Sequence, residues 1–169
     1  MARADDQAAR LLAEAGVSKA PVDVDKLAKH LGAQVVYEHY NQGDVSGMLV
    51  RQEGTTIIGV NSMHAATRQR FTIAHELGHL VLHRGRALVL DTPVRVNFRD
   101  RTSSLATDRE EMEANRFAAE LLMPTDLVLT AARGANQTTP DGLVAALAAK
   151  FEVSPEAMSY RLVNLGVLS

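Results

Sequence analysis

The sequence predicts an α+β protein in which a small antiparallel β-sheet packs on a mostly helical body. Three observations support this fold class. The chain has 169 residues, 46% of them apolar, which is enough for one ordinary hydrophobic core. The pattern of apolar residues is typical of strands only between residues 33 and 61. Before and after that region, apolar residues recur at helical spacing, so helices should make up most of the chain.

The elements follow one another in a clear order. Two helices are expected first: residues 3–15, ending at Gly16, and a short helix that follows Asp23 and ends at Gly32. Three strands come next, the last two joined by a Glu53-Gly54 turn: residues 33–40, 46–52 and 55–61. The remaining predicted helices cover residues 65–83, 108–122, 125–133, 141–151 and 155–165.

The composition excludes several classes of protein and site. The chain contains no cysteine, which rules out disulfide frameworks, Cys-ligated zinc and thiol nucleophiles. A formal net charge of −2 provides no overall basic field for nucleic acid. The first residues, MARADDQAARLL, carry two aspartates where a signal peptide needs an apolar core. No apolar run approaches the roughly 20 residues that span a bilayer, so we expect a cytoplasmic protein without a membrane partner.

The strongest motif is His75-Glu76-Leu77-Gly78-His79, which reads HExxH. On a helix, residues four apart leave the same face, so both imidazoles can converge on one metal ion. Zn²⁺ lowers the pKa of a water that it binds, and Glu76 is placed to accept that proton as the catalytic general base. The alternative is a core helix that carries these polar residues without a metal, which would be energetically costly.

A third ligand must come from outside the motif. His83 is excluded because eight residues of helix separate it from His75 by roughly 12 Å. In the predicted helix 108–122, Thr107 and Glu110 form a capping box, which engages Glu110. On the helical wheel Glu113 borders the apolar face, so we favour Glu113 as the third metal ligand over Glu110 or Glu111.

A donor for the oxyanion of the reaction is also needed. The sequence offers five candidates and no means of choosing among them: Tyr37, Tyr40, His64, His83 and Tyr160.

Two separated stretches, RFTIAHELGHLVLH (70–83) and EMEANRFAAELLMP (111–124), resemble the ImmA/IrrE family of bacterial metallo-endopeptidases. The resemblance runs from about Val22 to Leu168. It implies a zincin-like fold with His75 and His79 as zinc ligands, Glu76 as general base, and Glu113 as third ligand. It also implies a protein substrate, namely an Xre-type helix-turn-helix repressor of stress-response, mobile-element or phage genes.

The resemblance further suggests two units, a zincin-like metallopeptidase domain over residues 1–139 and a helix-turn-helix-like helical subdomain over residues 140–169. The second unit carries only Lys150 and Arg161 as basic residues, so we expect it to pack on the body or dock substrate, and not to bind DNA. Residues 84–107 carry a local charge of +3, which favours either a flank of the substrate cleft or a solvent-exposed loop.

Two other functions remain open at this point. HExxH could serve a non-catalytic metal-binding regulator, or the C-terminal helices could belong to an antitoxin-like DNA- or protein-binding module. The metal itself is also open, because ions such as Mn²⁺ accept the same ligands as Zn²⁺.

Overall fold

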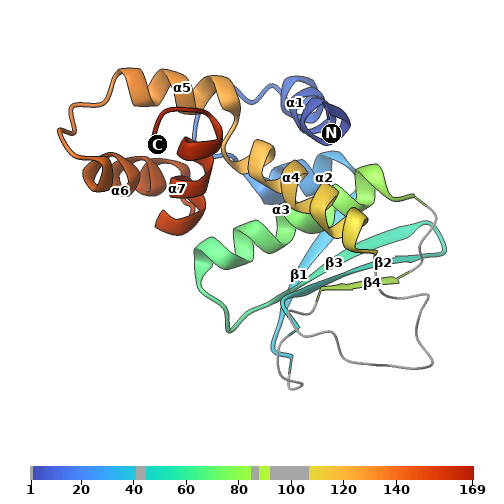
Figure 1. Ribbon diagram of the computed structural model, residues 1–169. Helices are drawn as coiled ribbons and strands as arrows, with labels where there is room; N and C mark the ends of the chain where they lie inside the picture. The colour runs from blue at the N-terminus through green and yellow to red at the C-terminus, as the bar shows by residue number, and fades with distance from the viewer. Residues whose placement is uncertain (1, 41–44, 85–87, 92–106) are drawn as a thin grey trace.

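The computed structural model describes residues 2–40, 45–84, 88–91 and 107–169. Within them, helices gather on one side of a single sheet, and the C-terminal helices form a group beyond one end of it (Figure 1). Most of the arginine-rich segment 84–107 lies outside the described residues. The prediction that this segment flanks the substrate cleft therefore stays a prediction.

The described elements confirm the α+β class. The helices are α1 (Ala2–Glu14), α2 (Val24–His30), α3 (Ala66–Leu82), α4 (Asp108–Leu122), α5 (Thr125–Arg133), α6 (Pro140–Phe151) and α7 (Pro155–Asn164). The strands are β1 (Ala33–Glu38), β2 (Gly47–Gln52), β3 (Thr55–Asn61) and β4 (Leu88–Asp91).

The sheet is mixed, and the prediction of a wholly antiparallel sheet is wrong in this respect. Its strand order is β1-β3-β2-β4, in which β2 pairs antiparallel with both β3 and β4, whereas β1 pairs parallel with β3. The chain reverses direction between β1 and β2 and again at the β2–β3 hairpin, so β3 runs parallel to β1. Strand β4 was not predicted.

Side-chain caps explain where three of the helices begin. Asp23 accepts a hydrogen bond from the Lys26 backbone N–H at the start of α2. Thr107 and Glu110 form the predicted capping box before α4. Ser154 caps α7, with Pro155 in its first turn.

Helix α3 is the centre of the molecule, since it lies between the sheet and the other helices (Figure 1). Its fully buried Ile73 and Leu77 belong to the same core as Leu49 and Ile58 of the sheet. Helix α4 packs against both α3 and α1. At its crossing with α3, Gly78 allows close approach, because a Cβ there would lie 3.0 Å from Ala114 Cα.

Two arginines attach the C-terminal helices to this body. Arg70 of α3 donates to the carbonyl oxygens of Val22, Phe151 and Glu152. Arg161 of α7 donates to the carbonyl oxygen of Met123 and pairs with the buried carboxylate of Glu120, both at the C-terminal end of α4. The packing thereby fixes α6 and α7 relative to the helix that carries HExxH.

Candidate metal centre

The HExxH segment lies on a helix, as predicted, in the C-terminal half of α3, with its polar side chains buried. His75, Glu76 and His79 are 2%, 0% and 1% exposed. The Nε2 atoms of the two histidines are 3.1 Å apart, so both rings present the same nitrogen to the same point. Two imidazoles arranged in this way supply two of the four ligands of a tetrahedral metal site.

The carboxylate that meets these two nitrogens belongs to Glu111. Its Oε2 lies 3.2 Å from His75 Nε2 and its Oε1 lies 3.2 Å from His79 Nε2. Among the described residues, His75, His79 and Glu111 are the group of three whose ligand atoms lie close enough together to hold an ion. Glu111 is therefore the third member of the cluster.

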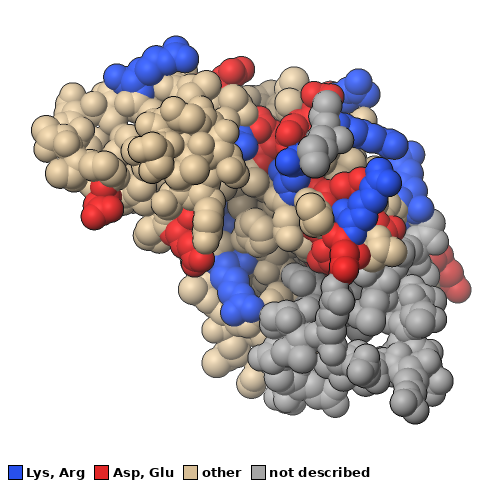
Figure 2. Space-filling view, viewed as in Figure 1, with Lys and Arg blue, Asp and Glu red and all other residues tan. Residues whose placement is uncertain are grey.

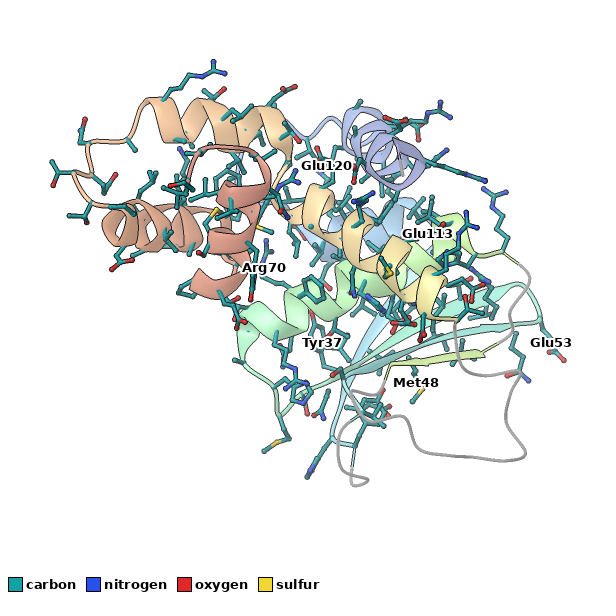
Figure 3. All side chains as sticks on the ribbon, viewed as in Figure 1. Tyr37, Met48, Glu53, Arg70, Glu113 and Glu120 are labelled. Atoms are coloured by element: carbon teal, nitrogen blue, oxygen red, sulfur yellow. The ribbon has the colours of Figure 1, made fainter. Side chains whose placement is uncertain are left out.

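Glu113, which the sequence analysis favoured for this place, lies elsewhere. Its Oε2 is 2.9 Å from His83 Nε2, and its Oε1 accepts a hydrogen bond of 3.0 Å from Arg109 Nε. Figure 3 shows Glu113 near the start of α4, beside the end of α3. The prediction that Glu113 faces His75 and His79 does not agree with this geometry.

The physical reason is that α4 is buried on two flanks. Glu111, Ala114 and Asn115 follow helical spacing along the flank that contacts α3. Glu113 lies about 200° of rotation from Glu111, on the flank that it shares with Phe117. A helical wheel shows a single broad apolar face for this helix. It therefore does not identify which glutamate faces the histidines. The spacing of four between Glu111 and Asn115 was the available signal.

The three ligand atoms suit a small divalent ion. Zinc bonds to imidazole nitrogen and carboxylate oxygen are about 2.0–2.2 Å long, so tetrahedral ligands lie roughly 3.3 Å apart. The two Nε2 atoms lie 3.1 Å apart, and each lies 3.2 Å from a different oxygen of the Glu111 carboxylate, which is close to that edge length. Two imidazoles and one carboxylate also leave a fourth position for water or substrate, as catalytic zinc sites do. The residues present therefore fit the metal that the motif implies.

Electrostatics favour the ligating form of each group. Burial alone would raise the pKa of Glu111, but its contacts with His75 and His79 lower that pKa to about 2. Burial lowers the pKa of His79, which favours the neutral imidazole. An ionised carboxylate beside neutral imidazoles is the state that binds a metal ion.

Each histidine also has a hydrogen-bond partner at its other ring nitrogen. His75 Nδ1 is 2.8 Å from Asn115 Oδ1, an oxygen that can only accept, so His75 donates. His79 Nδ1 is 3.0 Å from His83 Nδ1. His83 also occupies the C-cap position of α3. Outer contacts of this kind orient ligating histidines.

Strand β2 passes close to the catalytic candidate, Glu76. A Cβ on Gly47 would collide with the methyl group of Thr72 and would lie 3.6 Å from Glu76 Oε1. Glycine at this position therefore leaves room for the Glu76 carboxylate between the helix and the sheet.

The structure removes three of the five oxyanion candidates. The Tyr37 hydroxyl donates to Asp25. Tyr40 packs its hydroxyl on Gly59. Gly59 faces away from α3, because Val60, the next residue of β3, pairs with Gly47, and Gly47 faces α3. His83 is engaged by its two partners.

The two remaining oxyanion candidates, His64 and Tyr160, lie beyond the two ends of the HExxH turn. His64 follows β3 and lies 3.5 Å from the Asn61 side-chain nitrogen. Tyr160 of α7 is 66% exposed.

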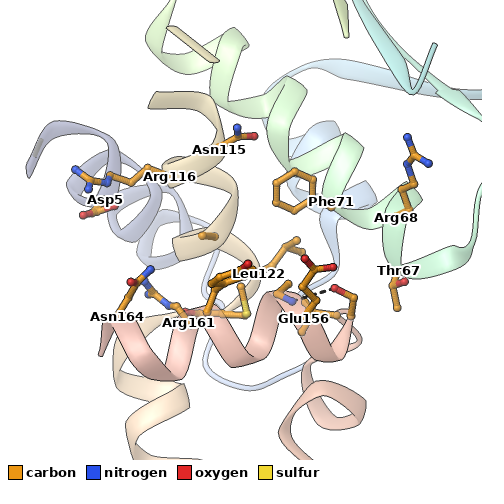
Figure 4. A pocket seen from close by; sticks show the side chains of 16 residues that line it. Asp5, Thr67, Arg68, Phe71, Asn115, Arg116, Leu122, Glu156, Arg161 and Asn164 are labelled. Carbon is orange, nitrogen blue, oxygen red and sulfur yellow. Dashed lines mark hydrogen bonds between the residues drawn. The ribbon is translucent and has the colours of Figure 1, made fainter. Parts of the chain in front are cut away.

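A cavity of about 960 Å³ adjoins the cluster where α7 faces α3 and α4 (Figure 4). Asn115 and Phe71 line it, and these two residues also touch His75, by a hydrogen bond and by a ring contact of 6.3 Å between centroids. The opposite wall is α7, with Glu156 and Tyr160. The cavity thus lies beside the metal cluster, next to the residues that hold the His75 ring, and its lining does not include His75, His79 or Glu111.

Comparison with known proteins agrees with this site. Residues 28–163 match the peptidase family described as the IrrE N-terminal-like domain. The chain is 32% identical over 127 residues to Metallopeptidase ImmA of Bacillus subtilis (strain 168), a match that covers 75% of this chain and 68% of the relative.

A solved structure shares the fold. The chain superposes on a transcriptional regulator of Mycobacterium tuberculosis with a TM-score of 0.61 at 19% identity, covering 96% of this chain. The superposed part is 46% of that protein, so this chain spans about half of its length.

Proposed function

Since the chain belongs to the ImmA/IrrE family of metallopeptidases, we propose that it is a zinc-dependent endopeptidase with His75, His79 and Glu111 as metal ligands and Glu76 as general base. One observation carries the proposal. The Nε2 atoms of His75 and His79 lie 3.1 Å apart, and each lies 3.2 Å from one of the two carboxylate oxygens of Glu111, so ligands from two helices converge as a zinc site requires. A buried cluster held only for stability would not require a glutamate at position 76.

The chemistry divides between the ion and the chain. Bound zinc supplies Lewis acidity, which polarises the scissile carbonyl and makes water easier to deprotonate. Glu76 accepts a proton from the attacking water at its carboxylate and later delivers that proton to the leaving amine. Its burial excludes bulk water from this transfer, and the backbone at Gly47 leaves space for the carboxylate to move.

We propose a protein substrate, specifically an Xre-type helix-turn-helix repressor whose cleavage relieves repression of stress-response, mobile-element or phage genes. The metallopeptidase family supports a peptide substrate. The cavity between α3, α4 and α7 has a volume of about 960 Å³, which is more than one side chain occupies. This size supports binding of a segment of a protein substrate.

We also propose that residues 140–169 form a helical subdomain that docks substrate and does not bind DNA. Its single arginine on α7, Arg161, is directed into the protein, where Glu120 and Met123 engage it. On the face shown in Figure 2, the surface over α5 to α7 carries no cluster of Lys and Arg. A helix without an available arginine is a poor phosphate binder.

The cytoplasm suits this function, and we propose it as the location of the protein. No helix within the described ranges is long and apolar enough to cross a membrane. An Xre-type repressor acts in the same compartment as the DNA that it binds. We propose zinc and not manganese because the site has two imidazoles and one carboxylate. Imidazole ligands suit zinc, whereas manganese prefers a site made of oxygen ligands.

The variant Glu76→Gln tests the proposed mechanism. The zinc-loaded chain is incubated with the purified helix-turn-helix repressor encoded nearest to its gene, and fragments are identified by mass spectrometry. Wild type should cut at one defined bond, whereas Glu76→Gln should bind zinc with equal stoichiometry and cut at least about 10³-fold more slowly. Glu53→Gln, in the exposed β2–β3 turn, is the matched control.

Two outcomes would contradict the proposal. Cleavage by Glu76→Gln at the rate of wild type would remove Glu76 from the mechanism. Zinc-loaded wild type that binds the repressor tightly without cutting it would instead support a non-catalytic metal-binding regulator.

A further inference from the structure

We propose that His83 and Glu113 are positioning residues, which form with His79 a hydrogen-bonded relay that holds the His79 ring in its metal-binding tautomer. This inference rests on the proposed function, because it concerns how one ligand of that site is held. It assigns a role to Glu113, which lies outside the cluster, and to His83, which is too far along the helix to join it.

The relay is continuous over three side chains. His79 Nδ1 lies 3.0 Å from His83 Nδ1, and His83 Nε2 lies 2.9 Å from Glu113 Oε2. Arg109 donates to the remaining oxygen, Oε1, at 3.0 Å. We call His79, His83 and Glu113 the His79 relay.

With a metal ion on His79 Nε2, hydrogen-bond chemistry leaves one arrangement of protons along the relay. An ionised carboxylate can only accept, so His83 Nε2 carries the hydrogen and donates to Glu113. A neutral His83 then has no hydrogen on Nδ1, which must accept from His79 Nδ1. His79 is left with a lone pair on Nε2, the nitrogen that faces His75 and Glu111.

The two histidines of the cluster are held in the same tautomer by different means. Asn115 accepts from His75 Nδ1 through a neutral amide oxygen, in one step. His79 is held through a second imidazole that ends in a carboxylate. The Glu113 carboxylate therefore acts on the His79 ring through His83. It makes His79 a more basic, and so a stronger, ligand for the metal.

The backbone around the relay is fixed independently of its side chains. Arg51 of β2 donates to the carbonyl oxygens of His79, Leu80 and His83 at 3.2, 3.1 and 3.2 Å. The His79 carbonyl also accepts from the His83 backbone N–H, and the bonds from Arg51 provide further donors for the end of α3, where carbonyls run out of partners within the helix. The side chain of His83 is 7% exposed, so the ring is held between α3 and α4. A replacement at position 83 should therefore leave α3 intact.

The first test measures zinc affinity by chelator competition on the metal-free full-length chain. His83→Phe removes both hydrogen bonds and should weaken zinc binding about 10–100-fold. His83→Asn places an amide oxygen near the position of Nδ1 and should recover most of that loss. Glu113→Gln keeps an acceptor but removes the charge, so it should lie between wild type and His83→Phe.

The matched controls are His30→Phe and Glu14→Gln, both at exposed positions outside the relay, which should bind zinc as wild type does. Zinc affinity of His83→Phe within twofold of wild type would overturn the relay while leaving the metal centre in place. Wild type that binds no zinc would overturn the metal centre itself, so the two failures are distinguishable.

The second test needs no variant and so does not depend on mutant folding. In ¹⁵N-labelled wild type, a scalar coupling across the His79 Nδ1–H···Nδ1 His83 hydrogen bond should be observed, together with a protonated Nδ1 on His79. A packing role for His83 would produce neither signal. A His79 ring protonated at Nε2 in the zinc-loaded chain would contradict the relay.

Discussion

Replacement of Gly78 with alanine should disturb the metal centre through the fold. Gly78 lies where α3 crosses α4, and an alanine Cβ would lie 3.0 Å from Ala114 Cα, 3.1 Å from its carbonyl oxygen and 3.3 Å from its Cβ. Favourable contacts of this kind are about 3.5–4.0 Å long, so α4 must move away by roughly 0.5 Å. Two of the three atoms are backbone, which cannot rotate aside.

Two opposing terms set the effect on stability. Alanine in a helix interior is favoured over glycine by about 1 kcal/mol. Overpacking at a close helix crossing costs about 1–3 kcal/mol. We expect the overpacking to dominate, so that Gly78→Ala lowers the free energy of unfolding by about 1 kcal/mol, or the Tm by about 2–4 °C for a chain of this size.

The effect on the metal should be larger than the effect on stability. Glu111 and Asn115 are both carried by α4, one beside the two Nε2 atoms and the other bonded to His75. A shift of roughly 0.5 Å is a quarter of a zinc–ligand bond, so zinc affinity should fall about tenfold or more. Thermal unfolding and chelator competition measure the two effects separately.

Ser154→Ala is the matched control for this experiment. It removes the cap of α7 and should cost about 1 kcal/mol, but it leaves the crossing of α3 and α4 intact. Its zinc affinity should therefore equal that of wild type. A Gly78→Ala protein with the stability and zinc affinity of wild type would refute the reasoning.

Three further substitutions test separate parts of the account. Arg161→Ala leaves the carboxylate of Glu120 buried without its partner, so urea denaturation should show a loss of about 3 kcal/mol; a loss below about 1 kcal/mol would contradict a structural role for this pair. Thr107→Ala removes the capping box of α4 and should cost about 1 kcal/mol by the same measurement, and no change would mean that the cap contributes nothing in solution. Asn115→Ala should leave the circular dichroism spectrum unchanged and weaken zinc binding about 10–100-fold, because His75 loses its Nδ1 acceptor; unaltered affinity would remove Asn115 from the site.

The helices were predictable because their signals are local. Asp23, Thr107 and Ser154 each cap the helix that the sequence assigns to them. The sheet was less predictable, because strand direction depends on pairing between distant segments. The parallel pairing of β1 with β3 and the addition of β4 to β2 both depend on partners that a four- to seven-residue pattern does not identify.

The site divides in the same way. The convergence of His75 and His79 follows from the spacing of four residues within one helix. The choice between Glu111 and Glu113 depended on how α4 lies against α3, where Glu111 meets His75 and His79 and Glu113 meets His83 at the end of the helix. Since both flanks of α4 are apolar, only the tertiary packing distinguishes them.

The metal centre can be tested most directly by a crystal structure of the zinc-loaded chain, with diffraction measured at the zinc absorption edge. We predict one strong anomalous peak, about 2.0–2.2 Å from the Nε2 atoms of His75 and His79 and from a carboxylate oxygen of Glu111. Glu113 should remain bonded to His83. A peak ligated by Glu113, or no peak between the two histidines, would contradict the assignment.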